Sequence, residues 1–107
     1  KRDFTYIDDI VEGIYRLLLN DVTNKYEIYN IGNNQPYDLM SFIYILEKEI
    51  EIKAILYMMP MQKGDVFETY ANISKIYSTI GIKPIITLET GLKNFVAWYK
   101  QFYQKEN

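Results

Sequence analysis

Apolar residues recur at the spacing of an α-helix in two long stretches, and this periodicity constrains the fold more than any other feature of the chain. Near the start it predicts a helix from about Asp8 to Leu19, with an apolar face made of Ile7, Ile10, Val11, Ile14, Leu17 and Leu18. Near the end, Thr87 can cap a last helix whose apolar face consists of Leu88, Leu92, Phe95, Val96, Tyr99, Phe102 and Tyr103. We expect this aromatic last helix, Trp98 included, to pack in a core.

Two further helices and two strands are predicted between these ends. Asp38 can cap a helix with an apolar face made of Leu39, Phe42, Ile43, Leu46 and Ile50. A short helix is expected over Ser74–Ile80, because Gly81 can end it in a left-handed conformation. β-branched and aromatic residues predict short strands over Tyr26–Asn30 and Lys53–Met58. The expected fold class is α+β, a small helix-rich unit with two or three short strands that pair with residues outside this chain.

The stretch from Met59 to Lys75 reads MPMQKGDVFETYANISK and lacks any periodic core pattern. Pro60 and Gly64 punctuate its backbone, while Gln62 and Asp65 offer hydrogen-bonding groups. A polar turn placed between two apolar stretches is typical of a loop that contacts a ligand.

Composition excludes several classes of function. The chain has no His and no Cys, so it offers neither a disulfide framework nor thiolate and imidazole ligands for zinc. Its 12 basic and 14 acidic residues give a net charge of −2, which argues against a nucleic-acid partner. The carboxylates of Asp8, Asp9 and Glu12 could imitate a metal site, but a capped helix start predicts the same residues, and we expect no metal.

The 107 residues suit one domain, and no apolar run approaches the roughly 20 residues of a membrane helix. We therefore expect a cytoplasmic protein without a membrane partner. The five glycines form no G-x-G-x-x-G pattern, so a phosphate-cradling loop of that kind is not expected. The chain begins at Lys1 in what reads as the middle of a motif, which suggests a fragment of a longer protein.

Six short segments, taken in order, resemble one enzyme family. They are KRDFTYIDD at residues 1–9, YNIGN at 29–33, PMQKGDV at 60–66, YANISK at 70–75, IGIKP at 80–84 and FVAWY at 95–99. This order resembles the C-terminal part of the NAD-dependent nucleotide-sugar epimerases and dehydratases of the extended short-chain dehydrogenase type. Within that superfamily, the segments look most like UDP-glucuronate 4-epimerases.

The resemblance implies that residues 1–107 form a single C-terminal portion that binds a nucleotide-sugar. It also implies that the Rossmann domain, which holds NAD and a Tyr-x-x-x-Lys pair, lies outside this chain and is its partner. NAD is then the cofactor of the parent enzyme, and none is expected to bind the isolated chain. We expect no catalytic residue here and no activity from the chain alone.

Three residues are the candidates for holding the UDP moiety of a UDP-sugar. By resemblance, Arg2 contacts the diphosphate, a role that a guanidinium fork suits, and Asp65 accepts hydrogen bonds from ribose hydroxyls. Gln62 stands where many related epimerases carry an arginine, and its neutral amide can still donate and accept. From position alone, an ordinary surface arginine is the favoured interpretation of Arg2, and the resemblance reverses that preference. Without the resemblance, Asp65 could equally be a turn residue.

Neighbouring polar residues are assigned structural roles. Asn33 and Asn34 could face the cofactor, but we favour a turn. Asp9 is expected to cap the first helix, and Tyr6 to pack against other residues.

The leading prediction is a C-terminal substrate-binding fragment of a UDP-glucuronate 4-epimerase. Two alternatives stay open: a stand-alone, non-catalytic binding or assembly module derived from that family, and part of a related nucleotide-sugar dehydratase or reductase. A chain that lacks its cofactor domain would expose apolar surface, so self-association is a further possibility.

Overall fold

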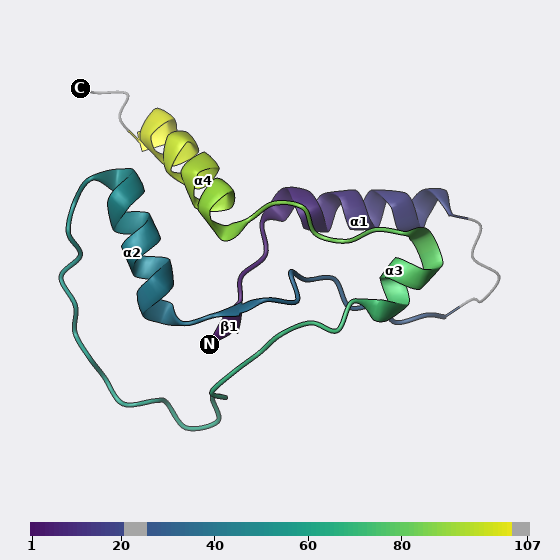
Figure 1. Cartoon of the computed structure of the whole chain (residues 1–107), viewed down its shortest axis with the longest axis horizontal. Helices are drawn as coiled ribbons and strands as arrows, with labels where there is room; N and C mark the ends of the chain where they lie inside the picture. The colour runs from purple at the N-terminus through teal and green to yellow at the C-terminus, as the bar shows by residue number, and fades with distance from the viewer. Residues whose placement is uncertain (21–25, 104–107) are drawn as a thin grey trace.

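The computed structural model describes residues 1–20 and 26–103 and contains four helices and a two-stranded sheet over these ranges. The helices are α1 (Ile7–Leu19), α2 (Leu39–Ile50), α3 (Ser74–Ile80) and α4 (Leu88–Tyr103). The strands β1 (Arg2–Asp3) and β2 (Pro36–Tyr37) pair antiparallel. In this helix-rich α+β arrangement, α2 packs against α4 on one side, while α1 and α3 lie on the other (Figure 1).

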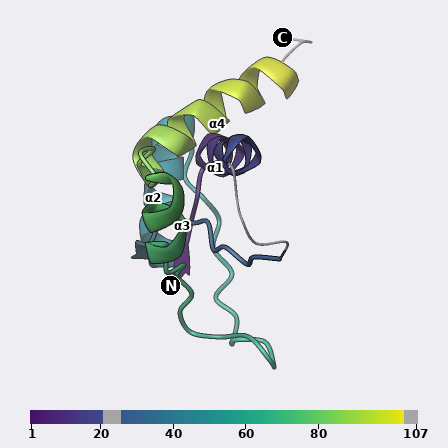
Figure 2. The ribbon, with the colours of Figure 1, turned by 90° about the vertical axis from the view of Figure 1, so that its right-hand side faces the viewer.

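The chain is flat and open. Its principal extents are 51 × 37 × 19 Å, and the narrow dimension is visible when the ribbon is turned by 90° (Figure 2). The radius of gyration is 17.0 Å, whereas a compact domain of this length has about 13 Å. A plate of this shape offers little interior, so few side chains can be buried.

The helix ends follow local sequence. Asp38 caps α2, and its carboxylate accepts hydrogen bonds from the backbone amide of Ser41 at 2.8 Å and from the Ser41 hydroxyl at 3.1 Å. The same two bonds lower the pKa of Asp38 from its ordinary value, the backbone bond most strongly. Gly81 ends α3 with φ +69°, and the Thr87 hydroxyl accepts from the Thr90 amide at the start of α4. These three predicted caps are confirmed.

The predicted cap of α1 is wrong. Tyr6 occupies the N-cap position without a side-chain cap, and Asp9 lies inside the first turn. The Asp9 carboxylate instead accepts the backbone amides of Ile85 and Ile86, at 3.3 and 3.1 Å. It thereby ties the connection between α3 and α4 to the start of α1, a long-range contact that sequence spacing does not reveal.

The buried side chains form two small clusters. On one side, Gly13 of α1 lies against Ile31, and Ile76 of α3 is only 1% exposed. On the other side, Leu88, Leu92 and Val96 of α4 are buried. The predicted packing of Tyr6 is confirmed, because its ring lies directly against Gly91 of α4, where an added Cβ would be 3.0 Å from the ring. Part of the predicted face of α4 is therefore core.

The aromatic part of that face is not core in this structure, and the prediction that it packs inside is wrong. Exposure of these side chains ranges from 46% to 61% for Phe95, Trp98, Tyr99, Phe102 and Tyr103. The rings instead contact one another along the helix, with centroids 5.3 Å apart for Trp98 and Phe102. Beyond the first turns of α4, the described residues provide no second layer to cover them.

Neither predicted strand forms. Residues 26–30 and 53–58 have no regular secondary structure, and Tyr26 and Tyr57 are 91% and 86% exposed. Strand propensity needs a partner that completes the hydrogen-bond ladder, and within the described part of the chain none lies alongside. The two strands that do form lie elsewhere, with Arg2 opposite Tyr37 and Asp3 opposite Pro36.

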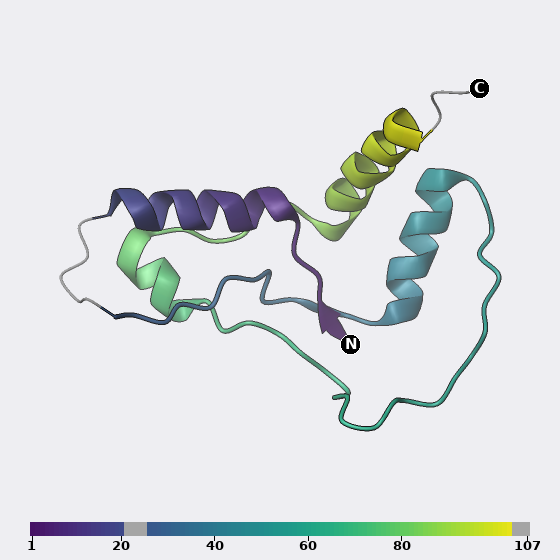
Figure 3. The same cartoon turned by 180° about the vertical axis from the view of Figure 1, so that it is seen from behind.

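Seen from behind, the N-terminal segment runs from β1 through the middle of the plate to α1 (Figure 3). The long connection from α2 to α3 leaves the end of α2, follows the edge of the molecule and returns beside β1 (Figure 1). This return brings residues 65–71 to the start of the chain.

Candidate functional site

Arg2 and Asp65, two of the predicted substrate residues, meet directly. The Arg2 guanidinium donates through Nη2 to Oδ1 of Asp65 at 2.6 Å, and through Nη1 to the carbonyl oxygen of Lys1 at 2.8 Å. Their side chains are 36% and 49% exposed, so the pair is open to solvent. An ion pair with this exposure contributes about 0–1 kcal/mol to stability. Its importance is that it places a cationic fork and a carboxylate at one point of the surface.

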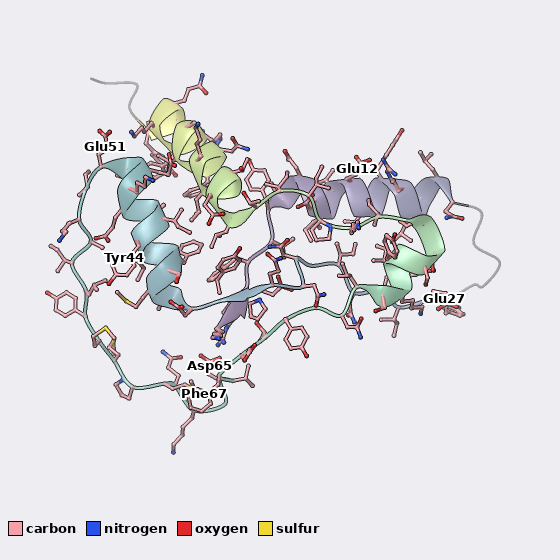
Figure 4. The ribbon with its side chains drawn as sticks, in the orientation of Figure 1. Glu12, Glu27, Tyr44, Glu51, Asp65 and Phe67 are labelled. Atoms are coloured by element: carbon pink, nitrogen blue, oxygen red, sulfur yellow. The ribbon has the colours of Figure 1, made fainter. Side chains whose placement is uncertain are left out.

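A tight turn presents Asp65. The Asp65 amide donates to the carbonyl oxygen of Gln62 at 3.2 Å, and Gly64 takes φ +84°, which a residue with a Cβ rarely adopts. Asp65 Oδ1 also accepts from the following amide, that of Val66, at 2.9 Å. Figure 4 labels Asp65 on the long connection, close to β1.

Gln62 belongs to the same turn, and its backbone closes the turn. Its side chain is exposed, and among the described residues its amide makes no hydrogen bond. The structure therefore brings all three predicted residues into one region, where the side chains of Arg2 and Asp65 bond to each other and Gln62 bonds to Asp65 through the backbone.

Asp3 is a residue of this region that the sequence prediction missed. Its carboxylate accepts three backbone amides: Asn33 on Oδ1 at 3.0 Å, and Asn34 and Ala71 on Oδ2 at 2.9 and 2.8 Å. The only signal in the sequence is its place beside Arg2 in the first motif. The favoured turn role of Asn33 and Asn34 agrees with these bonds and with φ +55° at Asn34.

An apolar pocket of about 510 Å³ lies apart from this polar region. Its lining comes from the segment after β1, from α2 and from α4, and includes Phe4, Phe42, Leu46, Leu92 and Phe95. The rings of Phe4 and Phe42 are 4.4 Å apart. Neither Arg2 nor Asp65 lines it, so this apolar pocket and the predicted polar contacts are different places.

The Tyr-x-x-x-Lys pair is expected only in the Rossmann domain outside this chain, but one such pair does occur in this sequence. Tyr44 and Lys48 are four residues apart and do fit that spacing. Both are exposed on α2, and in the part of the chain that the structure describes neither side chain makes a hydrogen bond (Figure 4). Tyr44 is 61% exposed, without the buried, charge-paired surroundings that activate a catalytic tyrosine. Nothing in the described residues assigns this pair a role in catalysis.

Two of the three acidic residues near the start of α1 have other partners. Glu12 pairs with Arg16 one turn along at 2.8 Å, and Asp9 holds the amides described above. Within the described ranges, no three acidic side chains gather where a metal ion could be held.

Comparisons with known proteins find similarity over most of the chain. Residues 1–32 match the model of the NAD dependent epimerase/dehydratase family. Over 95% of its length the chain is 43% identical to UDP-glucuronate 4-epimerase 5 of Arabidopsis thaliana, and over 92% it is 48% identical to an uncharacterized protein of Methanocaldococcus jannaschii. The start of this chain is thus similar to the NAD dependent epimerase/dehydratase family, and most of its length is similar to a UDP-glucuronate 4-epimerase.

The epimerase relationship extends to the three-dimensional structure. The crystal structure of UDP-glucuronic acid 4-epimerase from Bacillus cereus, in complex with UDP-glucuronic acid and NAD, superposes over 94% of this chain. Its TM-score is 0.78 and its sequence identity 32%, so the predicted resemblance and fold class are confirmed. The chain spans about a third of the length of such epimerases: 32% of that structure, and 26% and 30% of the two sequence relatives.

NAD, which the family name and that crystal structure specify, does not fit the described residues of this chain. The sheet has two short antiparallel strands, and no glycine-rich turn leads from a strand into a helix. The usual cradle for the pyrophosphate of a dinucleotide is such a turn at the edge of a parallel sheet. No helix in the described ranges is long and apolar enough to cross a bilayer.

Proposed function

We propose that this chain holds the nucleoside diphosphate end of a UDP-sugar as the C-terminal part of a UDP-glucuronate 4-epimerase. The observation that carries the proposal is the meeting of Arg2 and Asp65 at 2.6 Å from positions 63 residues apart. The relatives named as UDP-glucuronate 4-epimerases, and the crystal structure that holds UDP-glucuronic acid, support the choice of ligand.

The two residues have complementary chemistry for such a ligand. A guanidinium donates paired hydrogen bonds to phosphate oxygens, and bonds of this charge-assisted type are about twice as strong as neutral ones. A carboxylate accepts from the two hydroxyls of a ribose. Gln62, in the same turn, adds a neutral amide without adding charge. All three side chains are open to solvent, so a nucleotide can reach them.

These residues anchor the substrate and do no bond chemistry. Inverting a hydroxyl through a 4-keto intermediate requires the sugar ring to present both faces in turn to one hydride carrier. A fixed UDP group allows that rotation without release of the intermediate. NAD would supply the hydride acceptor in the parent enzyme, and the described residues of this chain do not form its site.

The test is a titration of the ¹⁵N-labelled chain with UDP and, separately, with uridine. Loss of the guanidinium in Arg2→Ala should weaken UDP binding about tenfold or more, since hydrogen bonds to charged groups contribute about 1.5–3 kcal/mol each. Uridine lacks phosphate, so its affinity should change little in that variant. Asp65→Ala should weaken both ligands, because both carry the ribose.

Arg16→Ala is the matched control. Arg16 is also an exposed arginine in an ion pair, with Glu12, and it lies on α1 away from the site. It should leave UDP binding unchanged. Equal losses in Arg2→Ala and Arg16→Ala would show that UDP responds to charge alone, and the proposal would fail.

The second candidate, a stand-alone binding or assembly module, is favoured by the open shape. The radius of gyration of 17.0 Å and the exposed aromatic face of α4 are features that a second copy of the chain could cover. Sedimentation velocity over a range of concentrations tests it. A concentration-dependent dimer together with no response to UDP would place this candidate first.

A further inference from the structure

The ion pair between Arg2 and Asp65 is too weak to hold Asp65 beside Arg2 by itself. Asp65 lies in a connection between α2 and α3 that has no helix or strand of its own over residues 51–73. Fixing the backbone of one residue costs about 1–2 kcal/mol, and an exposed ion pair returns at most about 1 kcal/mol. Other contacts must hold this connection beside β1.

Three hydrogen bonds do so: the Lys1 amino group donates to the Phe67 carbonyl oxygen at 2.6 Å, and two backbone amides of the connection donate to the first residues of the chain, one of them to Asp3. The Thr69 amide donates to the carbonyl oxygen of Lys1 at 3.1 Å, and the Ala71 amide donates to Oδ2 of Asp3 at 2.8 Å. Thr69 and Ala71 follow Asp65 by four and six residues, while Lys1 and Asp3 flank Arg2. The returning connection is therefore fastened on both sides of the arginine.

Asp3 also fastens the turn before β2. Its two oxygens accept hydrogen bonds from the amides of Asn33 and Asn34. Together with the bond from Ala71, one carboxylate therefore joins β1, the turn before β2 and the returning connection. Hydrogen bonds to an ionised acceptor are shorter and stronger than neutral ones, which suits a single group that must hold three donors.

Gly32 makes this junction possible. It is buried, and a Cβ added there would lie 2.5 Å from the Cβ of Ala71 and 2.9 Å from Oδ2 of Asp3. Real Cβ atoms do not approach so closely, so any side chain at position 32 must push the three segments apart.

We propose that Asp3 is a positioning residue of the nucleotide site: by binding the amides of Asn33, Asn34 and Ala71, it sets where Asp65 meets Arg2. This proposal rests on the proposed function for its ligand, UDP. Asp3 directs its carboxylate to the backbone, so it acts through Arg2 and Asp65.

The experiment compares Asp3→Ala with Asp9→Ala. Asp9 is a matched control, because it is also half-buried and also accepts two backbone amides, but these come from Ile85 and Ile86 in the connection between α3 and α4. Two quantities are measured on the ¹⁵N-labelled chain: the hydrogen-exchange rate of the Thr69 amide, whose acceptor is Lys1, and the dissociation constant for UDP.

Asp3→Ala should raise the Thr69 exchange rate and the UDP dissociation constant by about tenfold each, the coupling usual within one hydrogen-bond network. Asp9→Ala should change neither by more than about twofold. In an Arg2→Ala background, Asp3→Ala should weaken UDP binding by less than it does in the wild-type chain, since part of its effect passes through Arg2. A merely structural role would instead give additive losses.

The proposal is overturned if the Thr69 exchange rate is unchanged in Asp3→Ala, or if it rises equally in Asp9→Ala. Should wild-type chain show no UDP binding while Thr69 responds to Asp3→Ala as expected, the proposed function fails and the positioning role stands. If Asp3→Ala does not fold, the milder Asp3→Asn is measured in the same way. Whichever way its amide turns, that variant replaces an acceptor with a donor and loses at least one of the three bonds.

Discussion

Arg2 and Asp65 are 63 residues apart in the sequence, and the Arg2 guanidinium nitrogen Nη2 lies 2.6 Å from the Asp65 carboxylate oxygen Oδ1. Each side chain is therefore a charged partner of the other. A diphosphate that bound Arg2 would have to compete with Asp65 for the same guanidinium.

Removing either charge should leave the fold nearly as stable as before. We expect Arg2→Ala and Asp65→Ala to lower the free energy of unfolding by less than about 1 kcal/mol, because both side chains are open to solvent. Urea denaturation followed by circular dichroism measures this. A loss above about 2 kcal/mol would mean that the pair has a structural role larger than its exposure allows.

Substitutions of buried side chains should lower the free energy of unfolding far more. Ile76 is 1% exposed, and we expect Ile76→Ala to cost about 2–5 kcal/mol and Ile76→Val about 0.5–1.5 kcal/mol. Since few side chains are buried, the alanine variant is expected to leave the chain largely unfolded. Ile85, 83% exposed, provides the control, and Ile85→Val should be neutral in the same urea titration.

The end of α3 depends on a left-handed residue. Gly81 has φ +69°, and an added Cβ would meet nothing within 4 Å, so strain in the backbone is the only cost of a side chain there. Gly81→Ala should destabilise the chain by about 1 kcal/mol, and Gly81→Asn by less, because Asn adopts this conformation more readily. Equal midpoints of thermal unfolding for Gly81→Ala and wild type would contradict this account.

The cap of α2 should depend on pH. Hydrogen bonds from the Ser41 amide and hydroxyl lower the pKa of Asp38, so the folded state favours the charged carboxylate. The cap should contribute its full stabilisation above the ordinary pKa of 3.8 and lose it as the pH falls through the lower folded value.

The chemical shift of the Ser41 amide reports this titration directly. Its midpoint should lie below 3.8, the ordinary value for Asp38. Asp38→Asn keeps an oxygen acceptor at the cap but has no charge to lose, so its Ser41 shift should not follow that titration. A wild-type midpoint above 3.8 would be inconsistent with the capping bonds.

The sequence by itself determined the helices, because their signals are local. Periodic apolar residues place α1, α2 and α4, while Asp38, Gly81 and Thr87 act on amides within a few residues of themselves. The motif that contains Arg2 and the turn that contains Asp65 could be singled out for the same reason: each is a short run of letters.

Tertiary structure alone decided which of these segments meet. The strands predicted at residues 26–30 and 53–58 do not form, because a strand requires a neighbour that its own residues do not specify. Asp9 caps no helix, since the amides of Ile85 and Ile86 come within its reach only in the folded chain. Asp3 joins segments 30 and 68 residues away, and the exposed rings of α4 show that an apolar face becomes core only where a second layer covers it. Capping and periodicity act over one turn of chain, whereas pairing and burial depend on what lies alongside in space.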